Sequence, residues 1–188
     1  MPKDHVHQPG DCCNAPTETH SRRGFLTLAT LSAGVALLAP VVAKRAEAAG
    51  GTDILLLSCM DYRLMDEVAA YKQKRGLKDK YDHVILAGAS LGALTGAKPA
   101  WGQAFWEHVD VAKQLHHIKK IIVMDHRDCG AYKVFLGADA VSDANKETAA
   151  HAEQLRALHG QIKAKHPELA VELLLMDLKG AVAEITAA

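Results

Sequence analysis

Four short apolar segments constrain the fold of this chain more than any other feature of its sequence. Each segment is rich in Val, Ile or Leu and lacks the alternation of polar residues, as is typical of parallel strands covered on both faces. Helical patterns separate the segments, and strands that alternate with helices form an open α/β sheet. We therefore predict a single α/β domain with a mainly parallel open sheet of about four strands, flanked by helices. The predicted strands are residues 53–59, 83–89, 121–126 and 171–177, and the predicted helices are about 63–75, 100–117 and 146–165.

The first 48 residues differ in composition from the rest and have the features of an export signal. Arg22 and Arg23 resemble the pair of a twin-arginine signal, and residues 24–43 supply the apolar run that follows such a pair. Small residues at positions 46 and 48 match a signal-peptidase site, so we predict cleavage after Ala48. The protein is then periplasmic or otherwise exported, without a stable membrane anchor. Retention of the apolar run as an anchor is the alternative.

Residues 49–188 form the predicted domain, and their charges are balanced. Cleavage removes five of the 22 basic and four of the 22 acidic residues, which leaves 17 and 18. This balance argues against a nucleic acid or an anionic membrane as a partner. Only two of the four cysteines remain, Cys59 and Cys129. In an exported protein two cysteines usually form a disulfide, but a protein folded before export can instead keep both as metal ligands.

The two cysteines and one histidine lie where a sheet of this kind binds ligands. Cys59 ends the first predicted strand, whereas His126 and Cys129 lie three residues apart at the end of the third. The carboxyl ends of parallel strands form one edge of the sheet. One imidazole and two thiolates suit tetrahedral zinc, and three protein ligands leave one position open, as in catalytic sites. We predict a Zn²⁺ site at this edge, with a disulfide or two free thiols as the alternatives.

Two motifs together resemble the beta-class carbonic anhydrases, whose signature is Cys-x-Asp-x-Arg followed by His-x-x-Cys-Gly. The chain has CMDYR at 59–63 and HRDCG at 126–130, and the resemblance spans roughly residues 53–135. It implies a zinc enzyme, a carbonic anhydrase, that reversibly hydrates carbon dioxide to bicarbonate by a metal-bound hydroxide. It also implies a homodimer or a higher homo-oligomer, because members of the family typically assemble.

The resemblance assigns roles to the residues of both motifs. Family members bind zinc through two cysteines and a histidine, which correspond to Cys59, Cys129 and His126 here. An aspartate and an arginine form a dyad beside the metal, which corresponds to Asp61 and Arg63. Asp61 is expected to orient the hydroxide, while Arg63 holds Asp61 off the metal. If this pair breaks, Asp61 is the expected fourth ligand of a closed site.

One segment departs from the family pattern. Family members usually carry an Asn-Ala-Gly-Asn type segment after the second strand, whereas this chain reads LAGASLGAL at 86–94. Its glycines allow backbone amides to approach the metal, but the asparagine side chains are missing. The altered polarity keeps open the hydrolysis of carbonyl sulfide or carbon disulfide at the same site. A non-catalytic zinc-binding domain, with Asp61 as fourth ligand, is the third hypothesis.

Other polar and aromatic residues receive simpler interpretations. Arg127 and Asp128 are interpreted as exposed loop charges. Trp101, Phe105 and Trp106 are interpreted as packing residues of the second helix, with a subunit interface as the alternative. The other histidines of the domain have no partner at ligand spacing and are interpreted as surface or packing residues: His83, His108, His116, His117, His151, His159 and His166.

Overall fold

The computed structural model describes residues 52–187, so the predicted export signal and cleavage point lie outside the described residues. A five-stranded sheet has the order β2-β1-β3-β4-β5, in which the first four strands are parallel and β5 runs antiparallel to β4. The predicted fold class is confirmed, with one additional short strand. The strands are β1 (Ile54–Cys59), β2 (Tyr81–Leu86), β3 (Lys120–His126), β4 (Ala170–Met176) and β5 (Val182–Glu184).

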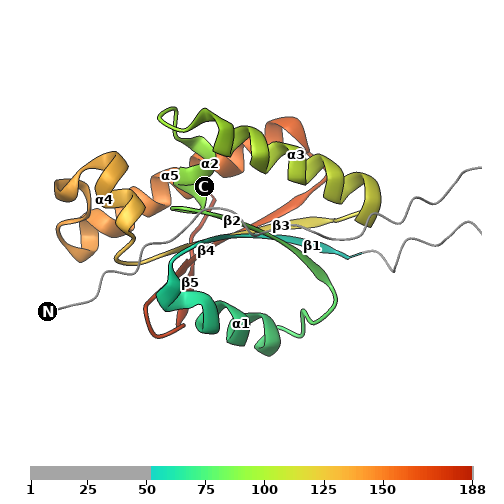
Figure 1. Ribbon diagram of the computed structural model, residues 1–188, viewed down its shortest axis with the longest axis horizontal. Helices are drawn as coiled ribbons and strands as arrows, with labels where there is room; N and C mark the ends of the chain where they lie inside the picture. The colour runs from blue at the N-terminus through green and yellow to red at the C-terminus, as the bar shows by residue number, and fades with distance from the viewer. Residues whose placement is uncertain (1–51, 188) are drawn as a thin grey trace, which may run out of the picture. The chain divides into compact units, whose positions relative to one another are not determined.

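Helices cover both faces of the sheet, but unequally (Figure 1). Helix α1 lies on one face, whereas α2, α3 and α5 lie on the other, with α4 near the carboxyl ends of the strands. Short 3-10 turns at Tyr62–Leu64 and Ala138–Val141 precede α1 and α5. The helices are α1 (Met65–Lys74), α2 (Ser90–Leu94), α3 (Pro99–His116), α4 (Gly130–Leu136) and α5 (Ala144–Lys165).

The core has two layers because successive side chains of a strand point to opposite faces. Leu55 and Leu57 of β1 belong to the layer beneath α3 and α5, together with Phe105. Leu56 belongs to the layer beneath α1, together with Val68. Both layers are filled by side chains of the apolar segments, which explains why these strands show no polar alternation.

The aromatic residues of α3 pack as predicted. Phe105 is fully buried, and the partly buried Trp106 packs against the same layer of the core. The ring of Trp101 meets that of Phe135 in α4 edge to face, with centroids 5.9 Å apart. These contacts use the large rings to join α3 to the core and to α4.

The segment after β2 turns sooner than predicted. The strand ends at Leu86 rather than at residue 89, because Gly88 and Ala89 have φ values of +79° and +42°. A side chain at Gly92 is excluded, since a Cβ there would lie 2.4 Å from the carbonyl oxygen of Ala87. The glycines therefore permit a tight turn that leads directly into α2.

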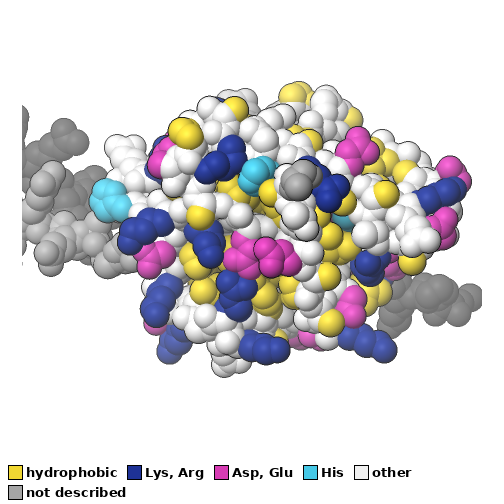
Figure 2. Space-filling view, turned by 180° about the vertical axis from the view of Figure 1, so that it is seen from behind, with side chains coloured by type: hydrophobic (Ala, Val, Ile, Leu, Met, Phe, Trp, Pro, Cys, Tyr) yellow, Lys and Arg dark blue, Asp and Glu magenta, His cyan; other side chains and the backbone are white. Residues whose placement is uncertain are grey.

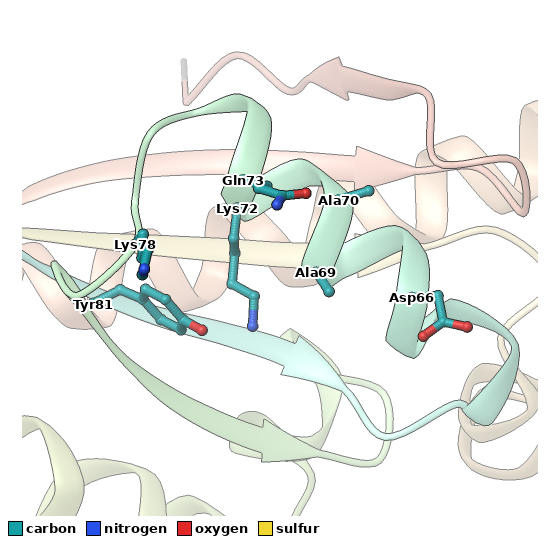
Figure 3. A pocket seen from close by; sticks show the side chains of 7 residues that line it. All are labelled: Asp66, Ala69, Ala70, Lys72, Gln73, Lys78 and Tyr81. Carbon is teal, nitrogen blue, oxygen red and sulfur yellow. The ribbon is translucent and has the colours of Figure 1, made fainter.

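The surface of the domain is mixed in charge and has a pocket that the predicted ligands do not line. Basic and acidic side chains are interspersed over the face shown in Figure 2. A pocket of about 430 Å³ lies beside α1 (Figure 3), and none of the predicted metal ligands lines it. Among the helices within residues 52–187, none combines the length and apolar character that a membrane span requires. The pocket is lined by Asp66, Ala69, Ala70, Lys72, Gln73, Lys78 and Tyr81.

Candidate metal centre

The three predicted ligands converge at the carboxyl edge of the sheet. Cys59 is the last residue of β1, His126 is the last residue of β3, and Cys129 immediately precedes α4. Their ligand atoms all lie within 4.8 Å of one another, and all three side chains are buried. Both cysteines are free thiols, so the structure does not pair them in a disulfide.

The spacing of the two sulfur atoms fits a shared tetrahedral ion. Cys59 Sγ and Cys129 Sγ lie 3.9 Å apart. Two thiolates bound to one zinc at about 2.3 Å with tetrahedral angles would lie about 3.8 Å apart. The observed separation is therefore close to the one that zinc requires.

The orientation of His126 also fits a metal. Its Nδ1 lies 2.8 Å from the carbonyl oxygen of Arg127, which can only accept, so Nδ1 carries the proton. Nε2 is then left with a free lone pair, and it is buried without a hydrogen-bond partner among the described residues. A buried polar atom without a partner is costly, and a bound ion would satisfy it. The donor set, the sulfur spacing and this unpartnered nitrogen all fit zinc.

The two thiols are electrostatically unequal. The hydrogen bond with Cys129 is the largest influence that lowers the pKa of Cys59, with further contributions from His126 and Gly88. The backbone N–H of Gly88 donates to Cys59 Sγ at 3.3 Å. The same pairing with Cys59 raises the pKa of Cys129. The Gly88 amide therefore favours negative charge on the Cys59 sulfur, and a metal that binds both sulfurs displaces their protons.

Asp61 and Arg63 lie beside this cluster and engage each other through both carboxylate oxygens. Arg63 Nη2 donates to Asp61 Oδ2 at 2.7 Å, and Arg63 Nε donates to Oδ1 at 3.0 Å. The hydrogen bonds from Arg63 lower the pKa of Asp61 to about 2. Asp61 Oδ2 also lies 3.9 Å from His126 Nε2. The structure therefore brings the predicted pair to the predicted ligands, while the catalytic roles of the pair stay predictions.

Asp128 is not the exposed loop charge that the sequence indicated. Its side chain is half-buried and accepts from Arg63 Nη1 at 2.8 Å, and its carbonyl oxygen accepts from Arg63 Nη2 at 2.9 Å. Lys133 also donates to Asp128, and the Asp128 N–H donates to Glu147. Arg127, interpreted in the same way, pairs with Glu147 at 3.1 Å. Asp128 has a φ of +56°, so these contacts hold a backbone conformation that is rare for residues other than glycine.

Two residues near the centre, Gly88 and His151, have contacts that the sequence does not predict. The segment 87–92 was expected to bring amides to the metal, and the structure identifies the Gly88 amide as a donor to Cys59. His151 is fully buried and lies 3.1 Å from a carboxylate oxygen of Asp125. Its buried position agrees with a packing residue, but its polar contact had no signal in the local sequence.

Comparisons with known proteins agree with the motifs. The sequence model of a family described as "Putative carbonic anhydrase" matches residues 50–186. An uncharacterized protein of Rickettsia conorii is 42% identical over 131 residues, which cover 70% of this chain and 70% of the relative. An uncharacterized protein of Rickettsia bellii is 41% identical over 131 residues, which cover 70% of this chain and 80% of the relative.

The structure of a beta-carbonic anhydrase agrees with the fold. Beta-carbonic anhydrase isoform I from Trichomonas vaginalis superposes with a TM-score of 0.50 at 17% identity, covering 73% of this chain and 84% of that one. A carbonic anhydrase from Glaciozyma antarctica has a TM-score of 0.49 at 16% identity, covering 73% of this chain and 83% of that one. The Trichomonas vaginalis protein thus shares the architecture in which the present motifs are arranged.

Proposed function

We propose, from the premise that this chain belongs to the family described as "Putative carbonic anhydrase", that it is a zinc-dependent lyase. The proposed reaction is the reversible hydration of carbon dioxide to bicarbonate. One observation carries the proposal: the buried cluster of Cys59, His126 and Cys129 has the Asp61–Arg63 pair at its side, 3.9 Å from His126 Nε2. The three candidate metal ligands and the ionised carboxylate of Asp61 thus lie side by side.

The ion would be held by Cys59 Sγ, Cys129 Sγ and His126 Nε2, with a fourth position free for water. Zinc bound there supplies the Lewis acidity that makes water a nucleophile near neutral pH, an established property of the zinc in carbonic anhydrases. Asp61 accepts a hydrogen bond from the attacking water and so directs a lone pair of the water oxygen towards carbon dioxide. The reaction consumes one water and one carbon dioxide and releases one bicarbonate and one proton.

Arg63 keeps Asp61 available for this task. Its guanidinium contacts both oxygens of Asp61 and is itself held by Asp128. Because these hydrogen bonds lower the pKa of Asp61 to about 2, the carboxylate stays ionised at neutral pH. The pair also opposes the movement of Asp61 into the fourth ligand position, where it would exclude water.

The assembly and the location of the protein extend the proposal. We infer a homo-oligomer from exposed apolar side chains near both motifs: Met60, Tyr62 and Val134 are 62%, 85% and 76% exposed. Light scattering of the purified protein tests this, and a monomer at all concentrations would contradict it. Export by the twin-arginine pathway is proposed from the sequence of residues 1–48.

Stopped-flow measurement of carbon dioxide hydration tests the proposed reaction. The zinc-loaded protein is expected to hydrate carbon dioxide faster than buffer between about pH 7 and pH 9, and Asp61→Asn is expected to lose most of that rate. Hydration no faster than buffer would refute the proposal. Release of hydrogen sulfide from carbonyl sulfide or carbon disulfide, without hydration, would assign the site a different substrate.

A further inference from the structure

A buried carboxylate, that of Asp125, receives hydrogen bonds from three separate segments of the chain. Ser90 donates to it twice, from its N–H to Oδ1 at 3.0 Å and from its hydroxyl to Oδ2 at 2.6 Å. The Tyr132 hydroxyl donates to Oδ2 at 2.5 Å, and His151 Nδ1 lies 3.1 Å from the same oxygen. All four residues are at most 1% exposed. We call Ser90, Asp125, Tyr132 and His151 the Asp125 cluster.

Ser90, Tyr132 and His151 all act as hydrogen-bond donors to the Asp125 carboxylate. Burial, followed by the Asp125 carboxylate, raises the pKa of Tyr132 well above its ordinary value, so the phenol keeps its proton and donates. A carboxylate oxygen accepts, so His151 Nδ1 carries the proton on the side of Asp125. The rings of Tyr132 and His151 pack closely, with centroids 3.8 Å apart. Such a network is rigid because few alternative arrangements satisfy every donor.

Three members of the cluster lie within three residues of a residue that belongs to the metal centre or contacts it. Asp125 immediately precedes His126 on β3, and Tyr132 follows Cys129 by three residues on α4. Ser90 follows Gly88 by two residues, and the Gly88 N–H donates to Cys59 Sγ. One carboxylate therefore fixes the segments that carry the ligands from β3 and α4, together with the amide that contacts the third ligand.

Stability alone gives little reason for this arrangement. A buried charged group surrounded by donors is usually no more stabilising than well-packed apolar side chains of similar volume. Other buried residues on the same helix as His151, including Leu155, Leu158 and Ile162, are apolar. The polar network is thus confined to the end of the sheet where the metal centre lies.

We propose that the Asp125 cluster is a positioning device for the metal centre, which holds the Gly88 amide on the Cys59 sulfur and Cys129 at its distance from Cys59. This inference rests on the proposed zinc site. Outer partners of metal ligands typically change metal affinity or activity by about 10- to 100-fold when they are removed. Loss of one donor from the cluster is therefore expected to weaken zinc binding by about tenfold.

Two substitutions each remove one hydroxyl and keep the surrounding packing: Ser90→Ala and Tyr132→Phe. The zinc dissociation constant is measured by competition with a chelator, and the sulfur-to-metal charge-transfer bands are recorded after cobalt substitution. Unfolding by urea measures stability for each variant. Ile162→Val is the matched control, because Ile162 is fully buried in the same core and has no polar contact with the cluster.

We expect both cluster variants to bind zinc about tenfold more weakly and to shift the cobalt bands, whereas Ile162→Val is destabilised without either change. In the metal-free protein, Ser90→Ala should also speed hydrogen exchange at the Gly88 amide relative to the control. If Ser90→Ala does not fold, Tyr132→Phe gives the same test. Equal zinc affinity and identical bands in all variants would overturn this inference alone. A wild-type protein that binds no zinc would overturn the proposed function and this inference together.

Discussion

Replacement of Arg63 by lysine separates catalysis from stability. Lysine keeps the positive charge but has no planar fork, so it cannot contact both oxygens of Asp61 as Arg63 does at 2.7 and 3.0 Å. The side chains of Arg63 and Asp61 are 33% and 15% exposed, and ion pairs at this exposure stabilise a fold by about 1 kcal/mol at most. Arg63 also donates to Asp128, but Lys133 and Glu147 still hold Asp128 in the variant, so the free energy of unfolding should change by about 1 kcal/mol or less.

The effect on activity should be larger. Partners that orient groups beside a metal typically contribute about 10- to 100-fold, which corresponds to about 1.4–2.8 kcal/mol of transition-state stabilisation. Without the fork, Asp61 is free to rotate away from the attacking water or into the fourth ligand position. We expect kcat/KM for carbon dioxide hydration to fall by at least about tenfold in Arg63→Lys, measured by stopped flow, with urea unfolding measured in parallel.

The chain supplies a matched control for this substitution. Arg75 makes a similar forked pair with Glu172, at 2.7 and 3.1 Å and with 39% and 16% exposure, and neither residue belongs to the two motifs. Arg75→Lys should lose similar stability and keep full activity. Equal activity in the two variants, or equal loss in both, would refute the role assigned to Arg63.

Three further predictions concern the fold, the pH dependence and the export signal. Gly92→Ala should destabilise the protein by about 1–3 kcal/mol in urea unfolding, because a Cβ at this position would lie 2.4 Å from a backbone oxygen. Gly160→Ala is the control: its Cβ would meet nothing within 4 Å, so the substitution should be neutral or stabilise the protein by up to about 1 kcal/mol. Burial lowers the pKa of His83 to about 4, so the unfolded chain binds a proton that the folded protein excludes, and stability falls as pH decreases below the unfolded value. The full pKa difference corresponds to about 2 kcal/mol between pH 6.5 and 4.5, and solvent around the half-buried ring reduces this. The wild type should therefore lose about 1 kcal/mol more than His83→Gln in urea unfolding, and equal losses would contradict the assignment. Mass spectrometry of the exported protein should find a chain that begins after Ala48, and an intact N-terminus would contradict cleavage.

The strands and main helices were predictable because burial on both faces leaves a local record in the sequence. The predicted parallel strands agree closely with β1, β3 and β4. The predicted end of β2, residue 89, was wrong because the backbone turns at Gly88 and Ala89. The residue type of an alanine gives no sign that its φ is positive. The strand β5 was missed because its three residues carry no periodicity.

The ligand cluster was predictable because metal chemistry restricts residue types and spacing. Cys59, His126 and Cys129 combine an unusual set of donors with positions at strand ends. The surroundings were not predictable in the same way, since Asp128 meets Arg63 across 65 residues and Asp125 meets Ser90 across 35. An aspartate and a serine are common residue types, so only the folded arrangement distinguishes these from loop residues.

Zinc K-edge X-ray absorption of the zinc-loaded protein tests the central claim most directly. The site described here predicts one zinc per chain with two sulfur neighbours at about 2.3 Å and nitrogen or oxygen neighbours at about 2.0–2.1 Å. In Cys129→Ser the sulfur shell should fall to a single neighbour. A zinc ion surrounded only by nitrogen and oxygen, or a sulfur shell unchanged in Cys129→Ser, would contradict the account.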